Sequence, residues 1–129
     1  MFTVALIGNP NCGKTTLFNA LTGTHQRVGN WPGVTVEKKI GDAEINGLNI
    51  SVVDLPGIYS LEQEYLGLDE QIARDFLAAG EFDRVINILD ASNLQRHLVL
   101  TQQLLDSGHK VIAALNMLDV AEDTVLSPG

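Results

Sequence analysis

The sequence predicts an α/β fold, in which a mostly parallel sheet has one antiparallel hairpin at its edge and helices on both faces. Short apolar runs rich in β-branched residues alternate with segments of helical periodicity, which is typical of such folds. A glycine-rich loop joins the first apolar run to the first helical segment. Asn46-Gly47 lies between two strand-like runs and is the strongest short-range signal for a hairpin.

The first half of the chain is expected to contain three strands and one helix. Phe2–Ile7 is a short apolar run that suits a buried strand, and Lys14–Thr22 is a helix that ends before a glycine. Residues 24–35 contain glycine and proline and are expected to form a loop. Val36–Ile45 and Leu48–Asp54 are the two strands of the predicted hairpin.

The second half is expected to alternate helices and strands after a loop that runs from Leu55 to about Leu68. Asp69–Ala79 has helical periodicity and begins with two acidic residues, which suit the positive end of a helix. Val85–Leu89 and Val111–Leu115 are strand-like runs, and Ser92–Ser107 between them is a helix. This helix is expected to have one apolar stripe, at Leu94, Leu98, Thr101 and Leu105.

Length and composition limit the number of domains and the classes of partner that we expect. The 129 residues, 45% of them hydrophobic, suit one globular domain, so we expect residues 1–129 to form a single domain. With 16 acidic and 8 basic side chains the net charge is −8, which would repel nucleic acid. No apolar run reaches the ~20 residues of a membrane-spanning helix, so we expect no direct membrane insertion. Cys12 is the only cysteine, which fits a reducing compartment such as the cytoplasm.

Residues 8–15, the glycine loop, match G-x-x-x-x-G-K-[ST] between a predicted strand and a predicted helix, the context in which this pattern binds phosphate. Backbone N–H groups would hold phosphate oxygens, Lys14 would neutralise the β/γ charge and Thr15 would ligate Mg²⁺. The alternative is a chance glycine-rich turn, which gives no reason for an ammonium at a helix N-terminus. The residues expected to bind nucleotide here are Gly8, Asn9, Pro10, Asn11, Cys12, Gly13, Lys14, Thr15 and Thr16.

A second motif, Asp54-Leu55-Pro56-Gly57, follows a predicted strand. Asp54 would reach Mg²⁺ as in a Walker-B site, and the N–H of Gly57 would bond the γ-phosphate. Asp and Pro-Gly also form ordinary turns, so this motif depends on the glycine loop for its meaning. Thr35 is expected to ligate Mg²⁺ when a triphosphate is bound, and the alternative is a threonine that simply begins a strand.

Asn116, Met117 and Asp119 follow the last predicted strand and resemble the N-K-x-D segment with which GTPases recognise guanine. Asp119 can accept from guanine N1–H and N2–H₂ together, a pair that adenine does not present. The alternative is that Asn and Asp form a turn or a helix cap. Met117 replaces the usual Lys and covers the base without a cation, so we expect modest nucleotide affinity.

These motifs resemble the cytosolic G domain of the bacterial ferrous iron transport protein B (FeoB) family. The resemblance covers nearly the whole chain, through residues 8–19, 26–37, 54–61, 90–94 and 114–119. It implies a P-loop NTPase fold of the Ras-like kind and slow, Mg²⁺-dependent hydrolysis of GTP to GDP. It also implies helical and transmembrane domains that move Fe²⁺, with this segment at the cytoplasmic face of the bacterial inner membrane. The resemblance adds Gly33 and Val34 to the nucleotide-binding residues.

Family members resemble potassium-stimulated GTPases, so the resemblance implies that Asn11 ligates K⁺ with the carbonyls of Gly29 and Trp31. Ile58 replaces the glutamine that orients the attacking water in many GTPases, and it has no polar atom. Trp31 is expected to be exposed in one nucleotide state, and the alternative is an anchor in the core. The resemblance thus assigns catalysis to Asn11, Lys14, Thr35 and Gly57.

A G domain of this class has one more strand and helix after the guanine segment, and we expect this chain to lack them. Their absence would weaken nucleotide binding and leave the edge at Val111–Leu115 open to another molecule, such as a second copy in a homo-oligomer. Three functions stay open: a slow K⁺-stimulated GTPase, a nucleotide-dependent switch with negligible turnover, and an inert fragment. Asn116 and Asp119 disfavour an ATPase.

Overall fold

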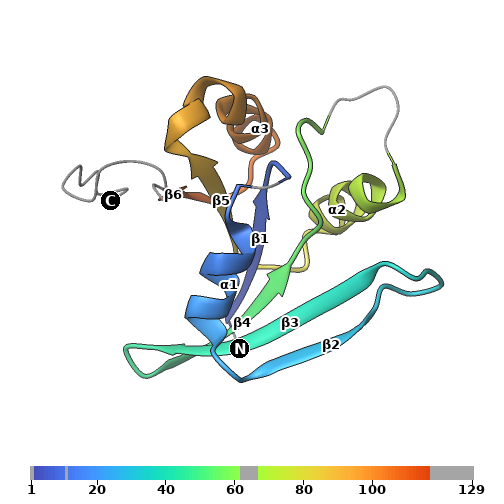
Figure 1. The fold of residues 1–129 in the computed structure, drawn as a ribbon, viewed down its shortest axis with the longest axis vertical. Coiled ribbons are helices and arrows are strands. Elements are labelled where there is room, and N and C mark those ends of the chain that lie inside the picture. The colour runs from blue at the N-terminus through green and yellow to red at the C-terminus, as the bar shows by residue number, and fades with distance from the viewer. Residues whose placement is uncertain (1, 11, 62–66, 117–129) are drawn as a thin grey trace.

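The structure is a computed structural model that describes residues 2–10, 12–61 and 67–116. Within these ranges it contains one six-stranded sheet and three α-helices (Figure 1). The elements in chain order are β1 (Phe2–Gly8), α1 (Lys14–Thr22), β2 (Gln26–Asn30), β3 (Glu37–Ile45), β4 (Leu48–Asp54), α2 (Leu68–Ala79), β5 (Arg84–Asp90), a 3₁₀ turn (Ala91–Asn93), α3 (Leu94–Asp106) and β6 (Val111–Asn116).

The strands lie in the order β2-β3-β4-β1-β5-β6, so the first strand of the chain is central in the sheet. β1 pairs in parallel with β4 and β5, and β5 pairs in parallel with β6. β3 runs antiparallel to both β2 and β4. The predicted parallel sheet with an antiparallel edge is therefore confirmed, and the carboxyl ends of β1, β4, β5 and β6 lie at one end of the sheet, where α/β folds bind ligands.

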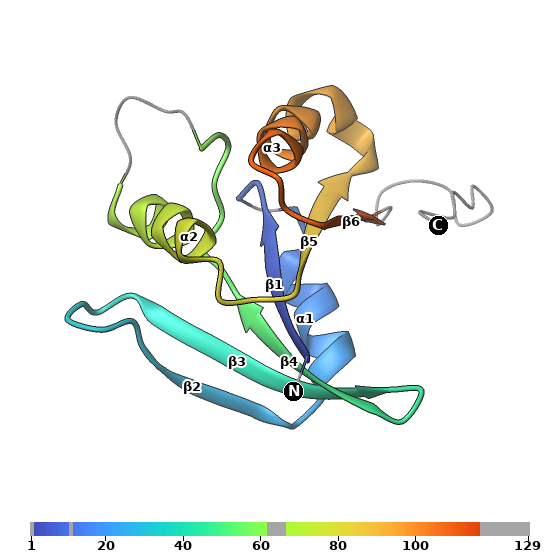
Figure 2. The ribbon, with the colours of Figure 1, turned by 180° about the vertical axis from the view of Figure 1, so that it is seen from behind.

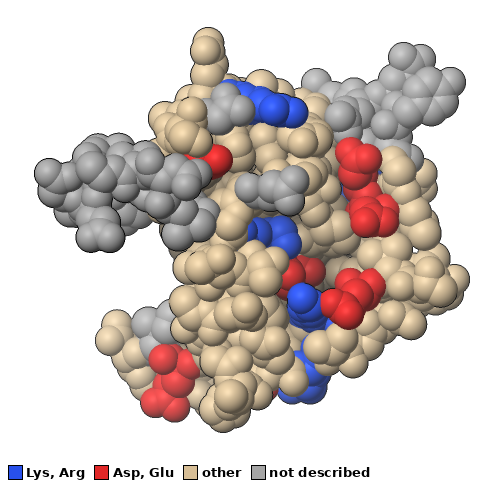
Figure 3. Space-filling model, in the orientation of Figure 1, with Lys and Arg blue, Asp and Glu red and all other residues tan. Residues whose placement is uncertain are grey.

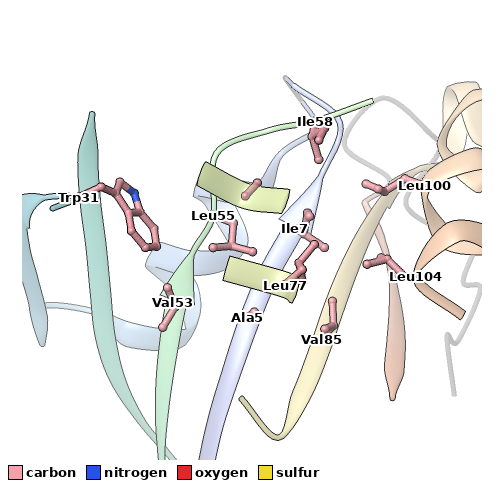
Figure 4. Packing of buried hydrophobic residues seen from close by; sticks show 11 residues of the cluster. Ala5, Ile7, Trp31, Val53, Leu55, Ile58, Leu77, Val85, Leu100 and Leu104 are labelled. Carbon is pink, nitrogen blue, oxygen red and sulfur yellow. The ribbon is translucent and has the colours of Figure 1, made fainter. Parts of the chain in front are cut away.

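Helices cover both faces of the sheet, as the two opposite views show (Figures 1 and 2). Alternating side chains of β1 serve the two faces. Ala5 and Ile7 pack in the cluster under α2 and α3, whereas Leu6 packs on the side of α1. Figure 4 shows Leu77 of α2 and Leu104 of α3 in the larger cluster, which joins the two helices to the sheet.

Residues with positive φ lie at the predicted turns. α1 begins after Gly13, which has a φ of 87°, and ends before Gly23, which has a φ of 57°. Asn46 and Gly47 also have positive φ, 52° and 78°, as a two-residue hairpin turn requires. Because glycine and asparagine tolerate this conformation better than other residues, α1 and the hairpin lie where the sequence predicts them.

One predicted loop contains a strand. The prediction of a loop over residues 24–35 is wrong for β2, which pairs with β3 from Gln26 opposite Gly41 to Asn30 opposite Glu37. Most side chains of β2 are exposed, so no alternation of apolar residues marks it in the sequence. Its strand conformation depends on backbone hydrogen bonds to β3, which propensity does not reveal.

α3 turns a different face to the core from the predicted one. Leu94, Leu98 and Leu105 of the predicted stripe are exposed. The helix has apolar residues on two faces, and periodicity alone does not decide which of them meets the sheet. α3 also starts later than predicted, because the Asp90 carboxylate accepts from the N–H of Ser92 at 2.9 Å and caps a 3₁₀ turn. The buried residues of α3 are His97, Leu100 and Leu104.

His97 of α3 is buried, with 6% of its surface exposed. Burial lowers the pKa of His97 below its ordinary value of 6.5. The charge of Asp90 and a hydrogen bond with the backbone of Ile88 oppose this shift, and the charge of Arg96 adds to it. The folded protein therefore favours the neutral imidazole.

We predict that Gly41→Ala destabilises the protein. A Cβ at Gly41 would lie 2.2 Å from Cγ2 of Thr22, which is buried at the end of α1. We expect the free energy of unfolding in urea to fall by about 1–3 kcal/mol, the usual cost of overpacking. Gly29→Ala in the neighbouring strand is the matched control, since a Cβ there meets nothing within 4 Å. Equal stability of the two variants would contradict the close contact.

We also predict that acid destabilises the protein through His97. Because the folded-state pKa lies below 6.5, the unfolded chain binds the proton more readily as pH falls through that value, so stability is lost on acidification. The thermal midpoint should fall between about pH 7.5 and about pH 5.5, and it should fall less in His97→Gln. His25→Gln, at an exposed position, is the control and should behave like wild type. The same pH dependence in all three proteins would refute the role of His97.

Candidate functional site

The glycine loop bends tightly from the end of β1 into α1. A Cβ at Gly8 would lie 2.6 Å from Sγ of Cys12 and 2.9 Å from the carbonyl oxygen of Ile88, so this position admits no side chain. Gly13 precedes the helix in a left-handed conformation that favours glycine. Asn11 lies outside the described residues.

Lys14 and Asp54 meet beside the glycine loop. The Lys14 ammonium contacts Oδ1 of Asp54, which ends β4 next to β1. The two side chains are only 13% and 10% exposed, so solvent screens their attraction little. The structure thus joins two residues that the sequence predicts for one site. Thr15 and Thr16, in the first turn of α1, are exposed.

The segment after β4, residues 55–61, is called the second loop. Its first part packs against the glycine loop. A Cβ at Gly57 would lie 2.9 Å from both N and Cα of Pro10, so the two backbones pack without a side chain between them. The N–H of Ile58 donates to the carbonyl of Gly8 at 2.9 Å, and the Ile58 side chain is fully buried (Figure 4). Ile58 therefore contributes packing at this position and no polar group.

Residues 31–36 form a separate closed turn. The N–H of Trp31 donates to the carbonyl of Val36 at 2.9 Å, and the N–H of Val34 donates to the carbonyl of Trp31 at 3.2 Å. Gly33 has a φ of 75°, and Thr35 is exposed. Figures 1 and 2 show this turn at the far end of the β2–β3 ribbon, away from the glycine loop. The structure therefore does not bring Gly33, Val34 or Thr35 to the Lys14–Asp54 pair. Gly29, in β2, also lies away from this pair.

Trp31 is a core residue in this structure, which is the alternative that the sequence left open. Only 7% of its surface is exposed, and its ring meets Phe76 of α2 edge-on with 5.7 Å between centroids. The Lys38 ammonium lies 4.6 Å from the centre of the indole. The nearby glycine and proline favour an exposed loop, but the indole of Trp31 is buried against α2.

The predicted guanine segment begins at the end of β6. Asn116 is opposite Asp90 in the parallel pair of β5 and β6, so its backbone lies at the same end of the sheet as the glycine loop. Met117 and Asp119 lie outside the described residues. Hydrogen bonds from the side chain and backbone of Ser92 lower the pKa of Asp90, which keeps a negative charge at this end of the sheet.

Cys12 is buried in the glycine loop, and burial raises the pKa of its thiol. Contributions from Lys14 and the loop backbone oppose this shift without reversing it, so the thiolate is disfavoured.

In the part of the chain that the structure describes, no three His, Cys, Asp or Glu side chains gather as metal ligands. On the face in Figure 3, basic and acidic groups are interspersed. Within the same residues, each helix falls short of the length or hydrophobicity that a bilayer span demands.

Sequence reasoning missed the burial of Asn9. This residue is 2% exposed, and among the described residues its amide oxygen and nitrogen find no hydrogen-bond partner. A buried amide without partners costs free energy, which a polar ligand or an ordered water recovers. Asn9 is buried because it directly follows a central strand. Its position after the first apolar run was the feature of the sequence that could have predicted this burial. The glycine loop therefore contains a polar group suited to a polar ligand.

The profile of the family described as Ferrous iron transport protein B matches residues 2–127 of this chain. Over 124 residues the chain is 56% identical to the Fe(2+) transporter FeoB of Legionella pneumophila (strain Lens). This match covers 95% of the present chain and 16% of that protein, so the chain corresponds to a small part of its relative.

Two solved structures have the same fold. The G domain of the T. maritima FeoB iron transporter matches with a TM-score of 0.86 and 52% identity, over 92% of this chain and 74% of that one. A GDP-bound mutant of the S. thermophilus FeoB G-domain matches with a TM-score of 0.83 and 50% identity, over 95% of this chain and 46% of that one. The Ras-like P-loop arrangement that the resemblance implies is therefore confirmed as the fold.

Proposed function

This chain belongs to the ferrous iron transport protein B family, and from that membership we propose that it binds GTP and GDP and hydrolyses GTP slowly. The observation that carries the proposal is the contact of Lys14 with Asp54 beside the glycine loop. The backbone segments there pack so closely that Gly8 and Gly57 leave no space for side chains. Such a backbone lets N–H groups approach phosphate oxygens closely. The GDP-bound relative from S. thermophilus supports the ligand class.

The phosphates would lie along the glycine loop and the N-terminus of α1, where N–H groups and the helix dipole favour negative charge. Lys14 would then exchange its contact with Asp54 for the β- and γ-phosphates. The buried amide of Asn9 would gain a partner in the loop or in a bound water. Asn116, Met117 and Asp119 would recognise guanine at the end of β6.

The residues near the loop fit Mg²⁺. Thr15 offers a hydroxyl and Asp54 a carboxylate, and this ion prefers hard oxygen ligands. When bound, Mg²⁺ would neutralise charge on the phosphates. Thr35 would complete the set only after the turn at residues 31–36 moves toward the glycine loop, and that movement would give up the packing of Trp31 on Phe76.

Hydrolysis would depend on backbone groups and K⁺ because the Ile58 side chain is buried and apolar. Gly57 would donate its N–H to the γ-phosphate, and Asn11 would ligate K⁺ with the carbonyls of Gly29 and Trp31. The Trp31 carbonyl already accepts from Val34, but a carbonyl has a second lone pair, so its donor chemistry fits a cation. Bound K⁺ would offset negative charge that develops during hydrolysis.

The burial of Ile58 also favours a second candidate function, a nucleotide-dependent switch with negligible turnover. In that case the output of the switch is the conformation of residues 24–37 and 55–68, and the rate of hydrolysis is too slow to matter. Multiple turnovers of GTP in K⁺ would favour the enzyme, whereas nucleotide binding without turnover would favour the switch.

The role of the whole protein is a proposal by relationship, since the chain spans 16% of the L. pneumophila transporter. We propose that this domain regulates or drives ferrous iron uptake through helical and transmembrane domains of the same protein. The domain would then lie at the cytoplasmic face of the bacterial inner membrane. Homo-oligomerisation through the edge at β6 would be a further partner interaction.

The first test is a titration of fluorescent GDP with Mg²⁺ in KCl. We expect unlabelled GDP to displace the probe and ADP to leave it bound, because Asp119 pairs with guanine alone. Lys14→Ala should weaken binding by about ten- to hundredfold, the cost of a lost charged hydrogen bond. Lys110→Ala removes an exposed lysine and serves as the control. Equal displacement by ADP, or unchanged binding in Lys14→Ala, would contradict the proposal.

A second test concerns K⁺. GTP hydrolysis should be faster in KCl than in NaCl at equal ionic strength, and Asn11→Ala should remove that difference while retaining GDP binding. Asn49→Ala changes an exposed asparagine and should keep the response to K⁺. An intact response in Asn11→Ala would show that Asn11 does not ligate the ion.

A further inference from the structure

α3 holds residues 59–61 of the second loop with three side-chain contacts. The N–H of Leu61 donates to Oε1 of Gln103 at 2.6 Å, and Nε2 of Gln103 donates to Oγ of Ser60 at 2.7 Å. Arg96, on the same helix, places its guanidinium carbon 4.5 Å from the centre of the Tyr59 ring. Gln103 therefore uses both ends of its amide on two consecutive loop residues.

These contacts begin directly after the segment that packs on the glycine loop. Gly57 lies against the backbone of Pro10, and the N–H of Ile58 donates to Gly8. Five consecutive residues, 57–61, are thus fixed first by the glycine loop and then by α3. A short segment fixed at both ends has little freedom, so release of one end loosens the other.

α3 is itself joined to the strand that leads into the glycine loop. The Thr101 hydroxyl donates to the side-chain oxygen of Asn87, and Nδ2 of Asn87 donates to the carbonyl of Ile7 at 3.3 Å. Asn87 is buried, and Leu104 of α3 packs in the same core as Ile7. The helix that holds the second loop therefore has a fixed position relative to the glycine loop.

We propose that Gln103 is a positioning residue, which keeps the second loop on α3 so that Gly57 stays beside the glycine loop, where its N–H can meet the γ-phosphate of GTP. The effect on hydrolysis rests on the proposed function. The docking of the loop on α3 does not, because it follows from the hydrogen bonds of Ser60 and Leu61.

The test is Gln103→Met in the full chain. Methionine keeps the unbranched length of the side chain and removes both the donor and the acceptor. Gln102→Met is the matched control: it makes the same change one residue away, where the exposed Gln102 bonds only Asp106 of its own helix among the described residues. The readouts are amide hydrogen exchange over residues 57–61, with and without GDP, kcat and KM for GTP, and GDP affinity.

We expect Gln103→Met to raise exchange at the amides of Ile58 and Leu61 by about tenfold, as the loss of hydrogen bonds lowers the local opening free energy. kcat should fall by about tenfold while GDP affinity stays within about twofold, because GDP lacks the γ-phosphate that the N–H of Gly57 would bond. Gln102→Met should match wild type in every readout.

Exchange in Gln103→Met equal to that of the control would overturn the docking of the loop. Raised exchange with unchanged kcat would overturn the positioning role. Failure of the wild-type protein to hydrolyse GTP would refute the proposed function, while the exchange data still decide the docking. If Gln103→Met does not fold, Ser60→Ala removes one of the two bonds and should raise exchange at Leu61 by a smaller factor; no change there would also overturn the proposal.

Discussion

The candidate site depends on how closely backbone segments approach one another at the carboxyl end of β1. Gly8 lies against the carbonyl of Ile88, and Gly57 lies against Pro10, in each case at a distance that a Cβ would violate. These two positions bring β5 and the second loop to the glycine loop. A side chain at either glycine would force the segments apart, and the hydrogen bond from Ile58 to Gly8 would be lost with them.

The second loop and the turn at residues 31–36 are held in different ways. The second loop is fixed to the glycine loop and to α3, largely through hydrogen bonds of its backbone and of Gln103. The turn at residues 31–36 is fixed to α2 through the aromatic contact of Trp31 with Phe76. One attachment is polar and the other is apolar, so salt, temperature and ligand charge act on them unequally. A condition that weakens one attachment therefore need not weaken the other.

Sequence predicted those parts of the fold that depend on local chemistry. Asn46-Gly47 and the glycines around α1 determine backbone conformation by themselves, so the hairpin has its predicted turn and the helix its predicted bounds. β2, the buried face of α3 and the core position of Trp31 depend on partners far along the chain, and local patterns could not reveal them. Within the site, the sequence placed Lys14 and Asp54 in one site but did not predict their direct contact. The contacts of Gln103 were not predictable, because a lone glutamine on a helix has no pattern.

The order of strands has a consequence for how the chain is made. β1 is synthesised before the other strands of the sheet, yet it lies at the centre, and its partners are β4 and β5. During translation its apolar residues, Val4 to Ile7, leave the ribosome long before Arg84–Asp90 can pair with them. A nascent chain of this topology carries a hydrophobic strand with one side unpaired until β5 is made, a state that favours aggregation and chaperone binding. The fold that places β1 at the centre of the sheet thus delays the full enclosure of this early strand until β5 has been made.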